Sequence, residues 1–135
     1  MGILAAFVLP HPPIVLPEIG HGEEMKIQST TDGFMEIATM IAELKPSTIV
    51  IVSPHAVMLR NSFYVCDTPR QHGDFSHFIA PEVRFEVETD LTFVKRLMQN
   101  CDLVERLDLD AGILDHGVMV PLYFIRKQWP DAKLV

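Results

Sequence analysis

The sequence predicts an α/β fold in which a mostly parallel central sheet carries helices on both faces. Residues 3–9 (ILAAFVL) and 48–53 (TIVIVS) are almost entirely apolar or β-branched, which is typical of strands that are covered on both faces. Stretches with helical hydrophobic periodicity alternate with such runs, as they do in strand–helix–strand units. The 135 residues show no internal repeat and are enough for one domain with a real core.

The first half of the chain is expected to hold two strands and the helix that joins them. Residues 3–9 end abruptly at Pro10, and the prolines on both sides of His11 force an extended, rigid loop. A helix is expected from about residue 23 to 45, because apolar side chains recur there at helical spacing: Ile27, Phe34, Ile37, Ile41 and Leu44. Pro46 marks its stop, and strand 48–53 then leads into Pro54 and His55.

The second half is expected to hold shorter elements. Residues 62–66 form a short strand, residues 68–81 are expected to be a long polar loop, and residues 83–88 (VRFEVE) alternate like a strand with one wet face. Thr89 is expected to cap a helix over residues 90–100, followed by a short strand at 103–107. A second, apolar helix spans residues 118–128 with Pro121 in its first turn, and residues 132–135 begin another strand.

Composition excludes several classes of function. The formal net charge is −7 and the arginines are scattered singly, so no nucleic-acid surface is expected. The apolar run 3–9 is too short for a membrane span or a signal peptide, so we expect a soluble, cytoplasmic protein. Cys66 and Cys101 form no CxxC pair and are expected to be reduced thiols.

Three histidines follow strand-like runs at the point where each run gives way to a turn: His11, His55 and His116. The carboxyl ends of parallel strands meet at one edge of the sheet, so these side chains are expected to converge. A single histidine is more often structural than a ligand, but three at one edge could bind a metal. Two imidazoles and a carboxylate suit a non-haem Fe(II) centre and also suit zinc. A closed structural zinc site is not expected, because the cysteines lack the spacing for it.

Four motifs occur in an order that resembles one known family. The motifs are LPHPP around His11, VSPH ending at His55, GDF at 73–75 with APEV at 80–83, and LDHGVMVPL around His116. With these motifs the chain resembles, over essentially its whole length, the LigB-like superfamily, the catalytic B subunits of class III extradiol ring-cleavage dioxygenases, and most of all its branch related to Memo proteins.

The resemblance implies roles for particular residues. His11 and His55 match the two histidine ligands of a non-haem Fe(II), and His116 matches the histidine that acts as general acid and base. An imidazole suits that role because it titrates near neutrality. Asp115 either orients a neighbouring imidazole or is a solvated turn residue.

The family's third ligand is a glutamate near the end of its domain, and no residue of this chain matches it. Glu82, Glu86 and Glu88 lie in a different sequence context. We therefore expect residues 1–135 to form the amino-terminal half of a LigB-like domain, with the glutamate beyond Val135 and no activity in the half alone. Such a half exposes sheet edge and apolar surface, which favours a homo-oligomer.

The leading functional hypothesis is an oxidoreductase that cleaves a small catechol-like aromatic substrate with dioxygen. Two alternatives are a non-catalytic, Memo-like binding module that uses the same pocket and a Zn-dependent hydrolase. Three further histidines are weaker candidates for the site. His21 either binds substrate or is a surface residue, while His72 and His77 either belong to a lid or are solvated loop residues.

Overall fold

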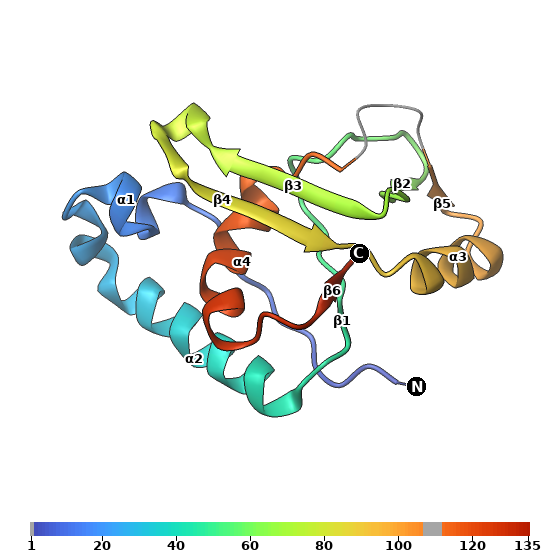
Figure 1. Ribbon diagram of the computed structural model, residues 1–135, viewed down its shortest axis with the longest axis horizontal. Helices are drawn as coiled ribbons and strands as arrows, with labels where there is room; N and C mark the ends of the chain where they lie inside the picture. Colours follow the sequence, from blue (N-terminus) through green and yellow to red (C-terminus); the bar gives the residue numbers. More distant parts are fainter. Residues whose placement is uncertain (1, 107–111) are drawn as a thin grey trace.

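The computed structural model describes residues 2–106 and 112–135, and it has the α/β class expected from the sequence (Figure 1). The helical elements, with 3₁₀ turns labelled η, are η1 (Pro13–Val15), α1 (Pro17–Gly20), η2 (Glu23–Ile27), α2 (Gln28–Leu44), η3 (Ser76–Phe78), α3 (Leu91–Asn100) and α4 (His116–Gln128). The strands are β1 (Thr48–Ile49), β2 (Phe63–Tyr64), β3 (Arg70–Phe75), β4 (Ala80–Glu88), β5 (Val104–Glu105) and β6 (Lys133–Leu134). No helix in the described ranges is long and apolar enough to cross a membrane.

The β-structure is small: the described part of the chain has three separate two-stranded sheets. β1 pairs with β6 and β2 pairs with β5, both in parallel, whereas β3 and β4 form an antiparallel hairpin. A parallel bridge between Thr89 and Leu134 connects the end of the hairpin to β6. The parallel pairs therefore join segments far apart in sequence, as expected of an α/β fold.

Helix α4 is the centre of the core. It lies between α2 and the β3–β4 hairpin (Figure 1), and its side chains from Met119 to Ile125 are all buried. Phe124 stacks on Phe34 of α2, with ring centroids 4.6 Å apart. A helix that is apolar on all sides is stable only when it is covered on all sides, which explains its central position.

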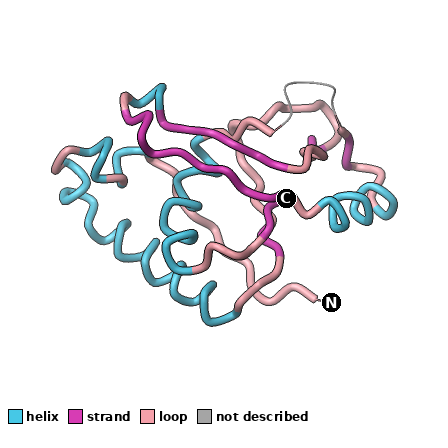
Figure 2. The backbone as a smooth tube through the Cα atoms, in the orientation of Figure 1, coloured by secondary structure: helices cyan, strands magenta, loops and turns pink. Residues whose placement is uncertain are grey.

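The expected strand at residues 3–9 is not present. The chain there is extended but unpaired among the described residues, and Figure 2 shows it as loop. Ile3 and Val8 are 92% and 99% exposed. An apolar run forms a strand only when its backbone groups pair with those of another segment, and no strand pairing of this stretch occurs within the described ranges. For the same reason β1 is shorter than expected, although Ile51 still donates to the carbonyl of Val135.

The expected loop at residues 68–81 is wrong, because most of it forms β3 and the turn η3. Gln71 and Phe75 of β3 are buried, while the residues between them are more exposed, which is the burial pattern of a strand. The sequence does not show this alternation, because the residues concerned are mostly polar or glycine. The helix cap is also corrected: Asp90, not Thr89, caps α3, and its carboxylate accepts from the backbone N–H of Phe93 at 2.9 Å.

The other expected elements are confirmed, with shifted bounds. The long helix begins as η2 and continues as α2, strand 83–88 extends back to Ala80, and the apolar helix begins at His116 instead of residue 118. Strand 103–107 is represented by β5, and its residue 107 lies outside the described residues.

Candidate metal centre

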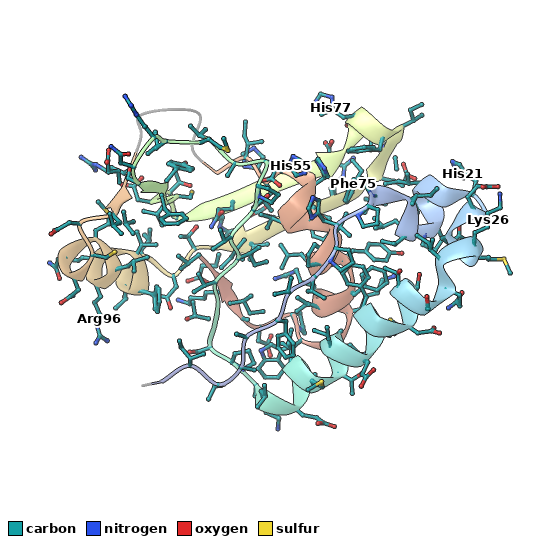
Figure 3. The ribbon with its side chains drawn as sticks, turned by 180° about the vertical axis from the view of Figure 1, so that it is seen from behind. His21, Lys26, His55, Phe75, His77 and Arg96 are labelled. Atoms are coloured by element: carbon teal, nitrogen blue, oxygen red, sulfur yellow. The ribbon has the colours of Figure 1, made fainter. Side chains whose placement is uncertain are left out.

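The structure brings His11, His55 and His116 together. His11 lies in the proline-rich stretch before η1, His55 follows the chain that leaves β1, and His116 is the first residue of α4. Figure 3 shows His55 beside the first turn of α4. Prolines next to His11 and His55 restrict both loops, which lowers the entropy cost of holding the rings in place.

The three rings form a compact cluster. The Nε2 atoms of His11 and His55 are 2.9 Å apart, and one nitrogen from each of the three histidines lies within 4.8 Å of the others. The ring centroid of His116 is 4.0 Å from that of His55 and 5.8 Å from that of His11. His55 is exposed and the other two are partly buried, so the cluster is open to a ligand on one side.

These distances fit a bound metal ion. With metal–nitrogen bonds of about 2.1 Å, two ligands at 90° have nitrogens about 3.0 Å apart, and two at the tetrahedral angle have them about 3.4 Å apart. The observed 2.9 Å between the Nε2 atoms is closer to the octahedral value, and it is also a normal hydrogen-bond length. No carboxylate belongs to this cluster in residues 2–106 or 112–135.

Asp115 connects the two loops behind the cluster. Its Oδ1 caps α4 by accepting from the backbone N–H groups of Gly117 at 2.7 Å and Val118 at 3.3 Å. The same oxygen accepts from the Ser53 hydroxyl at 2.6 Å, and the Ser53 oxygen accepts from the backbone N–H of His55 at 3.2 Å. Asp115 therefore links the backbone at His55, through Ser53, to the first turn of the helix that begins at His116.

Two glycines allow the close packing that this arrangement needs. A Cβ on Gly117 would lie 2.9 Å from Oδ1 of Asp115 and 3.2 Å from Cδ2 of His55, and it would also overlap the Ser53 hydroxyl. A Cβ on Gly73 of β3 would lie 2.7 Å from Sδ of Met119. Sequence reasoning did not single out Ser53, Gly117 or Gly73, although all three lie within or beside the motifs around the histidines.

The environment of His116 favours its neutral form. Desolvation by burial lowers its pKa, the nearby imidazole of His55 lowers it further, and His11 acts in the same direction. The Asp115 carboxylate partly opposes these effects. A neutral imidazole is the form that accepts a proton or binds a metal.

The weaker candidates lie outside the cluster. His21 ends α1 in a left-handed conformation, His77 lies in the hairpin turn, and Figure 3 shows both apart from His55. His72 is exposed on β3 and contributes its backbone, which bonds to Gly112 and Leu114. On β4, Glu86 pairs with Arg70 and Glu88 with Lys133.

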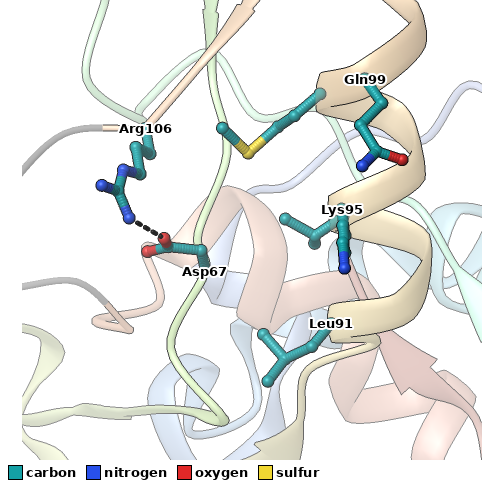
Figure 4. A pocket seen from close by; sticks show the side chains of 7 residues that line it. Asp67, Leu91, Lys95, Gln99 and Arg106 are labelled. Atoms are coloured by element: carbon teal, nitrogen blue, oxygen red, sulfur yellow. Dashed lines mark hydrogen bonds and ion pairs between the residues drawn. The ribbon is translucent and has the colours of Figure 1, made fainter.

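A separate open pocket of about 350 Å³ lies beside α3 (Figure 4). None of the three clustered histidines lines it. An ion pair of 3.3 Å between Arg106 and Asp67 closes one side, and the complete lining is Asp67, Leu91, Val94, Lys95, Met98, Gln99 and Arg106.

Comparison with known proteins identifies the family. Residues 5–135 match the family model described as the catalytic LigB subunit of aromatic ring-opening dioxygenase. Protein CA_C1420 of Clostridium acetobutylicum is 38% identical in an alignment of 147 residues that covers 100% of this chain and 31% of that relative. No solved structure matches. The chain therefore belongs to the LigB family of aromatic ring-opening dioxygenase catalytic subunits.

Proposed function

We propose that this chain supplies most of the metal site of an Fe(II)-dependent extradiol dioxygenase that opens a small catechol-like ring. In this proposal His11 and His55 bind the metal and His116 is the acid and base. The third ligand is a carboxylate outside residues 1–135, which form part of a LigB-like domain. The observation that supports it is the 2.9 Å contact between two imidazole nitrogens, beside a third histidine, in a member of this family.

Each histidine has a chemical task that its position supports. His11 and His55 hold the metal with adjacent nitrogens, and when bound Fe(II) would supply the redox chemistry that ring opening by dioxygen requires. Burial lowers the pKa of His116, which favours the neutral imidazole that can take a proton from a catechol hydroxyl and return it later. A substrate hydroxyl beside His116 would also be held close to the metal, which contributes proximity.

Two imidazoles and a carboxylate form the facial triad of non-haem Fe(II) oxygenases and also suit zinc. The match to the family of aromatic ring-opening dioxygenases supports iron in this proposal. The 2.9 Å separation of the two Nε2 atoms is also a normal hydrogen-bond length and does not choose between the two metals. A binding module without catalysis remains an outcome that the experiment below detects.

The test uses the full-length protein, loaded with Fe(II) without oxygen and then mixed with a panel of catechols and air. We expect oxygen uptake and a yellow ring-opened product. His55→Ala should lose the metal, whereas His116→Ala should keep the metal and lose turnover. His77→Ala is the matched control, because this exposed imidazole lies in the hairpin turn and should change neither. Metal binding without turnover of any catechol would contradict the enzymatic proposal, and no metal binding would contradict the site itself.

We also propose that the protein forms a homo-oligomer in the cytoplasm. Exposed apolar side chains on the unpaired stretch and on the chain after β1 support self-association: Ile3, Val8, Val50 and Val52. Sedimentation of the full-length protein tests this, and a monomer at micromolar concentration would contradict it.

A further inference from the structure

An aromatic side chain from the β3–β4 hairpin borders the histidine cluster. The ring of Phe78, in the turn η3, lies edge-on to His116, with centroids 5.4 Å apart and an interplanar angle of 65°. Phe78 has no part in binding a metal. It is only partly buried, although it packs against the core, so part of its ring stays accessible beside the cluster.

The hairpin turn is built so that Phe78 is held in this place. Beneath it lies Phe75, whose side chain is fully buried and whose ring centroid is 5.9 Å away. Before it, the Asp74 carboxylate accepts from the backbone N–H of Ser76 at 2.8 Å. The packing below and the turn before it both restrict where the Phe78 ring can lie.

The residue that follows Phe78 adopts an unfavourable backbone conformation. Ile79 has a φ of 61°, and its N–H donates to the carbonyl of Ser76 at 3.1 Å. A β-branched residue is strained in this left-handed region. Its side chain is 89% exposed, so its own burial does not compensate for the strain. The surrounding contacts, including the one between Phe78 and the cluster, must therefore hold the turn.

We propose that Phe78 is a specificity-determining residue whose ring forms an aromatic wall of the substrate site and selects aromatic ligands over aliphatic chelators. The proposal rests on the proposed function, because it places the substrate at His116. Phe78 already makes an aromatic contact with His116 at 5.4 Å, so its ring borders the space next to that imidazole. In the proposal, a ligand hydroxyl that hydrogen-bonds to His116 would carry its attached ring into this space, and aromatic pairs attract at centroid distances of about 4.5–7 Å.

The experiment measures anaerobic binding of two probes to the full-length, Fe(II)-loaded protein: 4-nitrocatechol, which is aromatic, and oxalate, which chelates through oxygen but has no ring. Phe78→Leu should weaken binding of 4-nitrocatechol by about 3- to 10-fold, the usual contribution of an aromatic pair. Oxalate binding and iron content should not change. Phe63→Leu is the matched control, because Phe63 lies in β2 and is 59% exposed. It should bind both probes like the wild type.

The outcomes separate this proposal from the proposed function. Unchanged 4-nitrocatechol binding in Phe78→Leu, or equal weakening of both probes, overturns the aromatic wall even if the wild type cleaves catechols. Selective weakening supports the wall even if no catechol is turned over. If Phe78→Leu does not fold, two other measurements test the proposed aromatic wall. Phe78→Tyr should keep wild-type affinity for 4-nitrocatechol, and the zinc-loaded wild type should show a nuclear Overhauser contact between the Phe78 ring and the probe. Loss of affinity in Phe78→Tyr, or absence of that contact, overturns the proposal.

Discussion

Replacing Gly117 by alanine would place a methyl group where the chain after β1 meets the start of α4. The added Cβ would lie 2.9 Å from Oδ1 of Asp115 and 3.2 Å from Cδ2 of His55, and it would overlap the Ser53 hydroxyl. Neither Asp115 nor Ser53 can move freely, because they are hydrogen-bonded to each other at 2.6 Å and Asp115 also caps α4. The loop that carries His55 must therefore shift.

The expected size of the effect follows from the contacts that would be disturbed. Inserting a methyl group into a packed site costs about 1–3 kcal/mol of stability. Disturbing the groups that orient metal ligands lowers metal affinity by about 10- to 100-fold. Gly117→Ala should show both effects, because the same Ser53–Asp115 hydrogen bond stabilises the helix start and positions His55.

Gly33→Ala is the matched control for this substitution. Gly33 lies inside α2, and nothing comes within 4 Å of the Cβ that alanine would add. Alanine should therefore stabilise the helix by about 0.5–1 kcal/mol and leave metal affinity unchanged.

Urea unfolding and calorimetric titration with Fe(II), or with Co(II) as a stable substitute, measure both quantities on the full-length protein. Wild-type metal affinity in Gly117→Ala would refute the reasoning, because it would mean that the position of His55 does not depend on this contact. Equal losses in Gly117→Ala and Gly33→Ala would also refute it.

Three further predictions concern the turn, the core and the acid–base residue. Ile79→Gly should raise the free energy of unfolding by about 1 kcal/mol in urea melts, because glycine removes the strain at a φ of 61° and little burial is lost; a destabilised variant would contradict this. Tyr123→Phe should lower the free energy of unfolding by about 1–2 kcal/mol, because the Tyr123 hydroxyl donates to Glu18 at 3.0 Å. Burial and this hydrogen bond also raise the pKa of Tyr123 to about 12. Unchanged stability of Tyr123→Phe would show that the bond contributes nothing. In the metal-free protein, NMR titration should give His116 a pKa below the ordinary histidine value of 6.5, because burial first and then His55 lower it. The neutral form of His116 therefore adds stability above pH 6.5 that is lost as the pH falls, and a pKa of His116 above 6.5 would contradict this.

Much of the fold follows from local patterns. Periodicity predicts the amphipathic helix α2, the apolar run with Pro121 in its first turn predicts α4, and alternation predicts strand 83–88. The strand at 3–9 was wrong because apolar character does not supply a pairing partner. The loop at 68–81 was wrong because Gly73 and the polar residues of β3 look like turn formers until Phe75 is seen to be buried. Strand pairing depends on segments distant in sequence, and local patterns do not contain that information.

Local patterns are enough to predict the α/β class and to place His11, His55 and His116 where apolar runs end, because hydrophobic periodicity and proline positions act locally. Three contacts at the site are visible only in the folded protein: Asp115 joins Ser53 to the start of α4, Gly117 makes room for His55, and Phe78 reaches His116 from a hairpin not expected there. These contacts depend on packing between elements far apart in the chain. Their distances are set by the core that forms around α4, and the order of residues alone does not specify them.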